Sequence, residues 1–172
     1  MLASSDGLIG GFNQQIGNEM GASMQYISIA SFFDTQSLTG LARFFYAQSE
    51  EEREHAMRFV RIVVDSGSEV RIPDIPAAKT GFASAAEAVG LALSWEKEVT
   101  QQIYDLVEIA RQDKNFMAER FLDWFVNEQY EEVTTMGELL DIVERAGEGN
   151  LLAVEEYLAR EGKVPPPPEG EG

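Results

Sequence analysis

The residues with the clearest capacity for chemistry in this sequence are its glutamates and its single histidine. Glu52 and His55 form a Glu-x-x-His motif, and side chains three residues apart lie on the same face of a helix. A carboxylate and an imidazole presented together suit iron or manganese. The chain has 172 residues, no cysteine and one histidine. This excludes disulfides, a thiolate zinc site, a cysteine nucleophile and any multi-histidine metal site within one chain.

The charge balance of the chain also favours the binding of cations. There are 30 acidic side chains against 13 basic ones, for a formal net charge of −17. Such an excess of carboxylates attracts cations and disfavours nucleic acids, whose binding requires clustered lysine and arginine. No run approaches the ~20 apolar residues that a membrane-spanning helix needs, and no basic signal region opens the sequence. We therefore expect a soluble cytoplasmic protein without a nucleic-acid or membrane partner.

Proline positions and helical periodicity predict the elements that must position these residues. No proline precedes Pro73, and none lies between Pro76 and Pro165, so long helices can form on either side of one interruption. The segment 68–83 contains Pro73 and Pro76, cannot continue a helix and is expected to be an extended crossover. The predicted helices span residues 7–34, 39–66, 85–112, 116–146 and 151–161.

These elements predict a single all-α domain over residues 1–163. Four long helices with a long crossover between the second and the third form a known connectivity of four-helix bundles, and the fifth helix is short. Residues 164–172, which are rich in proline, glutamate and glycine, are expected to form an exposed, disordered tail.

The core-facing seam of each long helix, read at alternating spacings of three and four residues, is apolar at both ends and polar near its middle. Because helix midpoints lie at one level in an antiparallel bundle, five of these polar residues should converge at one depth. They are Glu19, Glu52, His55, Glu96 and Glu132. In helix 116–146 the expected seam consists of Ala118, Phe121, Phe125, Glu128, Glu132, Thr135, Leu139 and Ile142.

A layer of acids in a core needs compensation. An unpaired buried carboxylate costs several kcal/mol, and none of the seam positions is lysine or arginine. The acids could take up protons, which would raise their pKa values, or a bound metal could supply the opposite charge. A single Glu-x-x-His motif often occurs by chance, and a lone seam acid usually reaches solvent. An acid in the middle of all four seams is much harder to explain in that way.

The helix 116–146 carries an altered second motif. Gln129 and Glu132 stand at the i, i+3 spacing where a second Glu-x-x-His would complete a symmetric pair of metal positions. A second position without an imidazole should be weaker and more exchangeable, which suits iron passing through the site. Tyr26 lies two helical turns from Glu19 and is interpreted either as a core aromatic or as a donor of an electron or hydrogen bond near the metals. For Trp124 we prefer the core interpretation.

Two segments carry a family resemblance. Residues 47–56, AQSEEEREHA, and residues 121–132, FLDWFVNEQYEE, resemble bacterial non-haem ferritins, and nearly the whole chain is similar to the actinobacterial type. The resemblance implies a ferritin-like bundle with a ferroxidase centre. It places the first iron on Glu19, Glu52 and His55, and the second on the bridging Glu52 with Glu96 and Glu132, near Gln129. A third iron position is implied at Glu51, Glu128, Glu131 and Glu132.

The resemblance also has a limit, which concerns haem. Bacterioferritins are similar to this chain but carry a second Glu-x-x-His and a haem-ligating methionine two residues before the histidine. Here Gln129 and Glu132 replace the motif, and Arg53 stands at the position of the methionine. We therefore predict no haem at that position.

The function implied by the resemblance is iron storage with ferroxidase activity. Such proteins oxidise Fe(II) with dioxygen or peroxide and store ferric mineral inside a cage of twenty-four subunits. In the family the helix that corresponds to 151–161 lines a channel on the fourfold axis. The Leu, Val and Tyr face of this helix would otherwise lack a partner, which favours the cage over a small dimer. Candidate channel acids are Glu119 and Asp123, and candidate mineral-surface acids are Glu138, Asp141 and Glu144, although each of these could be an ordinary solvated residue.

Two other functions compete with iron storage. One is a di-iron oxygenase or peroxidase related to rubrerythrin, which the absence of a Cys-x-x-Cys signature argues against. The other is a non-catalytic acidic helical scaffold whose seam acids are protonated or paired.

Overall fold

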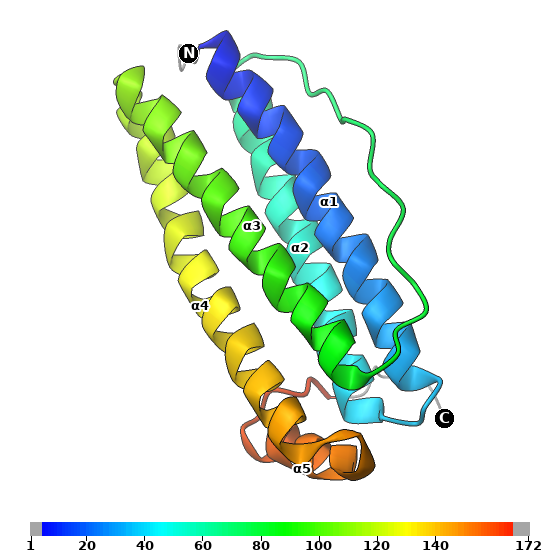
Figure 1. Cartoon of the computed structure of the whole chain (residues 1–172). Coiled ribbons are helices and arrows are strands. Elements are labelled where there is room, and N and C mark those ends of the chain that lie inside the picture. The colour runs from blue at the N-terminus through cyan, green and yellow to red at the C-terminus, as the bar shows by residue number, and fades with distance from the viewer. Residues whose placement is uncertain (1–4, 167–172) are drawn as a thin grey trace.

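The computed structural model describes residues 5–166, and Figure 1 shows a bundle of four long helices with a short helix across one end. Within this range no strand is present. The helical elements are α1 (Asp6–Asp34), α2 (Thr39–Asp65), α3 (Ala85–Gln112), α4 (Phe116–Ala146), the 3-10 turn η1 (Glu148–Asn150) and α5 (Leu151–Arg160). The predicted all-α bundle with a short fifth helix is confirmed, and the helix bounds agree with the predicted ones to within one residue.

The helices begin where the sequence supplies caps. Ser5, Ser84 and Asn115 each accept a hydrogen bond from a backbone N–H in the first turn of α1, α3 and α4, which satisfies donors that the helix itself cannot pair. At the other end of α4, Gly147 adopts a φ of +71°, a conformation that glycine reaches without steric cost. This turn directs the chain back across the end of the bundle.

The bundle core consists of two apolar clusters with a polar layer between them. The cluster near the end covered by α5 includes Phe33, Phe45, Val89, Ala92 and Leu139. The cluster toward the opposite end includes Phe12, Phe59, Ile103, Leu122 and Phe125. Because both ends of the core are packed with apolar side chains, the polar layer in the middle is closed off from solvent along the bundle axis.

The seam of α4 differs from the predicted one at every second position. The buried residues are Leu122, Gln129, Met136 and Val143, and not Phe121, Glu128, Thr135 and Ile142. The alternation therefore begins with a spacing of four and not three, while Ala118, Phe125, Glu132 and Leu139 are buried as predicted. Both neighbours are apolar at 121/122 and 142/143, but Met136 is more apolar than Thr135, and this pair favoured the observed spacing. As a result Gln129, and not Glu128, joins the buried layer.

The crossover 66–84 runs as an extended chain along α1 (Figure 1) and is held there by side-chain amides. Asn13 donates to the carbonyl of Glu69 (3.3 Å) and accepts from the N–H of Arg71 (2.8 Å). Gln25 donates to the carbonyl of Lys79 (3.0 Å) and accepts from its N–H (2.8 Å). These contacts satisfy backbone groups of a segment that has no regular structure of its own, and they fix it at two points along α1.

The apolar face of α5 is covered within the chain. Leu151, Val154 and Leu158 are buried against the end of the bundle, and Glu155 accepts a hydrogen bond from the backbone N–H of Leu41 at 2.8 Å. The prediction that the apolar face of α5 lacks a partner within the chain is therefore wrong, because the short turn after α4 brings α5 back onto its own bundle. That α5 also lines a channel remains a prediction.

The predicted tail begins with residues that contact the bundle. Val164 packs against the cluster near α5, and the carbonyl of Pro165 accepts a hydrogen bond from Arg43 at 3.2 Å. The expected disorder thus does not begin at residue 164, and the rest of the predicted tail, 167–172, lies outside the described residues. In the described part of the chain, no helix combines the length and the apolarity needed to cross a membrane.

The close approach of the crossover to α1 generates a stability prediction. A Cβ added at Gly17 would lie 2.3 Å from Cγ of Pro73, so Gly17→Ala should destabilise the fold by about 1–3 kcal/mol through overpacking. Gly10 lies in the same helix, with no atom within 4 Å of an added Cβ. Gly10→Ala should therefore stabilise the fold by about 0.5–1 kcal/mol. Thermal unfolding of both variants measures the difference, and midpoints that shift in the same direction would contradict this account.

Candidate metal centre

One buried polar layer crosses the middle of the bundle, and each long helix contributes a glutamate to it. At most 5% of the surface of each of these residues is exposed. They are Glu19 from α1, Glu52 and His55 from α2, Glu96 from α3 and Glu132 from α4. Gln129 and Tyr26 are also buried there. The structure therefore brings together the five seam residues that the sequence placed at one depth.

Three of these side chains form a compact group with the geometry of a cation site. Glu19, Glu52 and His55 each offer a ligand atom, and these atoms all lie within 4.8 Å of one another. Oε2 of Glu19, Oε1 of Glu52 and Nδ1 of His55 are buried and have no hydrogen-bond partner among the described residues. A buried polar atom without a partner typically costs about 1–3 kcal/mol. Three of the four buried atoms without a partner in the described part of the chain thus belong to one group of metal-ligating side chains, and this group fits a divalent metal ion.

The other half of the layer is more fully hydrogen-bonded. Tyr26 donates its hydroxyl proton to one oxygen of Glu96, and Gln129 donates to the other oxygen at 3.0 Å. Gln129 also donates to the backbone carbonyl of Glu96 at 3.2 Å. Of the two interpretations of Tyr26, the contact with Glu96 favours the hydrogen-bond donor. The lone pairs of Glu96 that could bind a cation are therefore already partly occupied by hydrogen bonds.

Burial and mutual repulsion raise the pKa values of the glutamates. Burial is the main cause of the raised pKa of Glu19, followed by the charge of Glu52, and burial together with the charge of Glu96 raises the pKa of Glu52. For Glu132 the same two causes raise the pKa to about 9. Without a cation the layer therefore holds protons near neutral pH, and a binding metal ion must displace them.

The acids implied for a third iron position lie at the edge of this layer. One oxygen of Glu128 is 3.9 Å from Nε2 of His55, so the partly buried Glu128 reaches the outer side of the imidazole. Glu51 accepts a hydrogen bond from Gln48 at 2.6 Å, and burial raises its pKa. Glu131 is exposed, although its charge contributes to the raised pKa of Glu132. These acids connect the buried layer to solvent between α2 and α4.

Aromatic side chains enclose the imidazole on its remaining side. The rings of Trp124 and Phe125 meet His55 edge-on, with centroids 5.4 and 5.8 Å away. The guanidinium of Arg58 lies 3.9 Å over the Trp124 ring. Trp124 is partly buried and packs against both the histidine and the apolar cluster toward this end of the core, so it is not a fully buried core residue. Aromatic walls limit the movement of the imidazole and keep water from its faces.

Two glutamines near the layer were not identified from the sequence as site residues. Gln15 donates to Oε1 of Glu19 at 3.0 Å, and Gln48 keeps a buried Oε1 without a partner. Each stands four residues before a layer glutamate, Glu19 and Glu52 respectively. Residues four apart are neighbours on a helix, so this spacing was the signal that could have identified them.

The remaining candidate acids lie on the surface, and two of them have basic partners. Glu119 accepts from Arg111 at 2.7 Å, and Glu138 accepts from Lys163 at 3.0 Å. Asp123, Asp141 and Glu144 are exposed. Arg53, on which the prediction of no haem rests, is exposed and lies 3.9 Å from Glu50.

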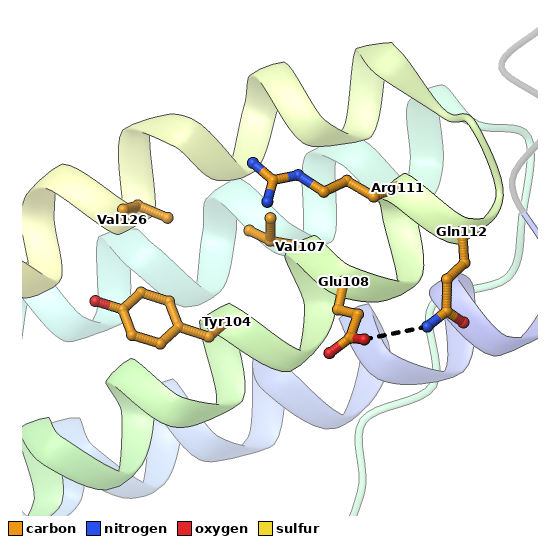
Figure 2. A pocket seen from close by; sticks show the side chains of 6 residues that line it. All are labelled: Tyr104, Val107, Glu108, Arg111, Gln112 and Val126. Carbon is orange, nitrogen blue, oxygen red and sulfur yellow. Dashed lines mark hydrogen bonds between the residues drawn. The ribbon is translucent and has the colours of Figure 1, made fainter.

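The pocket in Figure 2 is lined by residues other than those of the buried layer. It has a volume of about 630 Å³ and is lined by residues of α3 and α4, among them Tyr104, Glu108 and Arg111. Two of its polar side chains already have partners, since Glu108 accepts from Gln112 at 3.4 Å and Arg111 pairs with Glu119. None of the layer glutamates is among the residues that line this pocket, so the pocket is not part of the candidate centre.

Comparison with known proteins agrees with the fold. The family model described as a ferritin-like domain matches residues 9–146. The chain is 46% identical over 147 residues to the ferritin BfrB of Mycolicibacterium smegmatis, covering 86% of this chain and 81% of that protein. It is 35% identical over 144 residues to the bacterial non-heme ferritin of Staphylococcus haemolyticus, covering 84% and 87%. An open pore ferritin from Archaeoglobus fulgidus aligns in structure with a TM-score of 0.87 at 30% identity, covering 91% and 98%.

The raised pKa values predict how the stability of the metal-free protein depends on pH. Glu132 titrates near pH 9 when folded and near pH 4.3 when unfolded. Between these values the folded state binds more protons than the unfolded state, so stability falls as pH rises. We expect a lower unfolding midpoint at pH 8.5 than at pH 6, and Glu132→Gln should reduce this dependence. Glu156→Gln, at an exposed position on α5, is the control; equal slopes in the two variants would contradict the prediction.

Proposed function

The chain belongs to the ferritin family, and from this premise we propose that it is an iron-storage protein with ferroxidase activity. Its substrates are Fe(II) and dioxygen or hydrogen peroxide, and its product is ferric iron that mineralises inside a protein cage. The observation that carries this proposal is the buried group formed by Glu19, Glu52 and His55, which places three metal-ligating side chains with ligand atoms within 4.8 Å of one another. A non-catalytic scaffold would gain nothing from gathering two carboxylates and the imidazole in this way inside the core.

Charge supports a pair of ferrous ions in the layer. The four buried glutamates carry four negative charges when ionised, and two ferrous ions carry four positive charges. The described residues include no buried lysine or arginine, so the metal pair is the counter-charge that matches the layer. Oxidation to two ferric ions adds two positive charges that the same carboxylates do not balance. This mismatch favours uptake of hydroxide by the oxidised pair.

The proposed first position uses Glu19, Glu52 and His55. Glu52 lies between the two halves of the layer: its Oε2 is 3.5 Å from His55 Nδ1, and the charges of Glu96 and Glu132 act on it. We therefore assign it the bridging role. Each ferrous ion gives up one electron, and dioxygen takes both electrons and two protons to become hydrogen peroxide. With peroxide as the oxidant, the two electrons cleave its O–O bond and give two hydroxide ions.

The proposed second position uses Glu96 and Glu132, with Glu52 as the bridge and Gln129 nearby. It lacks an imidazole, and both oxygens of Glu96 accept hydrogen bonds, from Tyr26 and Gln129. Both features weaken metal binding relative to the first position. An exchangeable second position is useful in storage, because the oxidised ion has to leave the site.

Three further assignments remain part of the proposal. Glu51, Glu128 and Glu131, with Glu132, form a third iron position at the solvent edge of the layer, on the path from the buried pair toward α2 and α4 surfaces. No haem is bound at Arg53. Tyr26 acts on the reaction through its hydrogen bond to Glu96.

Storage also requires a compartment, and we propose a cytoplasmic cage of twenty-four copies of this chain. The support is the similarity to the open pore ferritin of Archaeoglobus fulgidus and the exposure of Leu152 on α5 and of Phe116 and Met117 at the start of α4. Large apolar side chains left exposed in one chain are available to a neighbouring subunit. Glu119 and Asp123 remain candidates for a channel through which iron enters, and Glu138, Asp141 and Glu144 for the mineral surface.

Single substitutions in the layer test the proposed activity. His55→Ala removes the only imidazole and should lower iron affinity at the first position at least roughly 10–100-fold, the range seen when residues supporting metal ligands are lost. Glu52→Ala should remove rapid oxidation as well, since it takes the bridge from both ions. Stopped-flow absorbance after aerobic addition of Fe(II) measures oxidation, and size exclusion reports assembly.

The matched control is Glu54→Ala, which removes an exposed acid between these two residues and should retain the wild-type rate. A wild-type oxidation rate in Glu52→Ala would show that the site is misplaced. Absence of rapid oxidation in the unmodified protein, or a small oligomer that retains no iron, would refute the storage function itself.

A further inference from the structure

A chain of side-chain amides leads from the surface to one carboxylate of the buried layer. Gln15 lies on α1 one turn before Glu19 and is only 2% exposed. Its amide nitrogen donates to Oε1 of Glu19 at 3.0 Å, while Oε2 of Glu19 has no hydrogen-bond partner. One oxygen of this carboxylate is therefore held by the protein, and the other is left for a ligand.

The carbonyl oxygen of Gln15 also has a hydrogen-bond partner. Asn18 donates to Oε1 of Gln15 at 3.0 Å and to Oε1 of Gln102, on α3, at 2.9 Å. At the outer end, Gln14 donates to Oδ1 of Asn18 at 3.1 Å. These hydrogen bonds connect α1 to α3 and end at a small surface pocket of about 230 Å³ lined in part by Gln14, Asn18 and Gln102.

The direction of each hydrogen bond in this series of amides follows from the carboxylate of Glu19 at its buried end. When a metal ion is bound, Glu19 is ionised and only accepts hydrogen bonds, so the amide nitrogen of Gln15 has to face it, as in the 3.0 Å contact with Oε1. The carbonyl oxygen of Gln15 then faces Asn18 and requires a donor there. Asn18 supplies its nitrogen and turns its own oxygen toward Gln14. The orientation of Gln15 is thus specified by its partners on both sides.

We propose that Gln15 is a positioning residue of the metal centre: it occupies one oxygen of Glu19 so that the other is presented to the first metal ion, and Asn18 and Gln102 hold Gln15 in this orientation. The inference rests on the proposed function, because it assigns Glu19 to the first iron position. Without the amide, Glu19 would be free to rotate or to turn both oxygens toward the metal. A ligand that is oriented before the ion arrives loses less conformational freedom on binding.

The direct test is Gln15→Met, which keeps the length of the side chain and removes the donor. Co²⁺, added alone and without oxygen, is a suitable probe because it does not turn over and its visible absorption reports coordination geometry. We expect the affinity for the first Co²⁺ to fall about 10-fold, with a changed absorption spectrum. The Fe(II) concentration that half-saturates oxidation should rise by a similar factor, with a smaller effect on the maximal rate.

Gln101→Met provides the matched control. Gln101 is an exposed glutamine on α3 that donates to Asp105 at 2.8 Å, so the same chemical change is made outside the amide chain. This variant should have the Co²⁺ affinity and spectrum of the unmodified protein. A loss of thermal stability in Gln15→Met with unchanged Co²⁺ binding would assign Gln15 a structural role only and would overturn the proposal.

A double-mutant cycle tests whether Asn18 acts through Gln15. Asn18→Ala should weaken Co²⁺ binding less than Gln15→Met does, and it should cause no additional loss when both substitutions are present. An equal loss in both backgrounds would show that Asn18 acts independently. If Gln15→Met does not fold, the test rests on Asn18→Ala alone, and a Co²⁺ spectrum of this variant equal to that of the unmodified protein refutes the proposal. Failure of the proposed function is distinct, because the unmodified protein would then neither bind Co²⁺ in the layer nor oxidise iron.

Discussion

The structure depends on the burial of four glutamates in one layer of a helical core. Carboxylates removed from water repel one another and lose hydration, which costs several kcal/mol per charge unless they are compensated. The described core provides one imidazole, a tyrosine hydroxyl and a few amides around them, but no basic side chain. Protons and metal ions therefore compete for the layer, and an incoming divalent ion gains the electrostatic energy that the empty layer lacks. Relief of the repulsion among the metal-free carboxylates thus contributes to the affinity of the layer for metal ions.

The surrounding structure keeps this layer from opening to water. The two apolar clusters close the bundle above and below it, and the aromatic rings of Trp124 and Phe125 cover the imidazole. The helix α1 has a double role. Its outer face braces the crossover through Asn13 and Gln25, and its inner face carries Glu19. Strain introduced where the crossover meets α1 is therefore transmitted to a helix that also positions a metal ligand.

The parts of this account that sequence predicted are those controlled by local patterns. Prolines at 73 and 76 and the helix caps set the element bounds, and one acid in each seam indicated the layer. The spacing within α4 was predicted wrongly: Phe121 and Leu122 are equally suited to a core, although Met136 beside Thr135 favoured the observed spacing. The docking of α5 depends on tertiary contacts such as that of Glu155 with the start of α2. Likewise, no pattern shows that Gln15 holds one oxygen of Glu19 while the other remains free.

The central claim is that two iron ions share the layer through Glu52. Crystals of the protein soaked anaerobically with Fe(II) and measured by anomalous diffraction at the iron edge test it most directly. The account predicts two anomalous peaks inside the bundle, one contacting Glu19, Glu52 and His55 and the other contacting Glu52, Glu96 and Glu132, with the second peak weaker. Peaks confined to surface acids, or a layer without any peak at saturating iron, would contradict it.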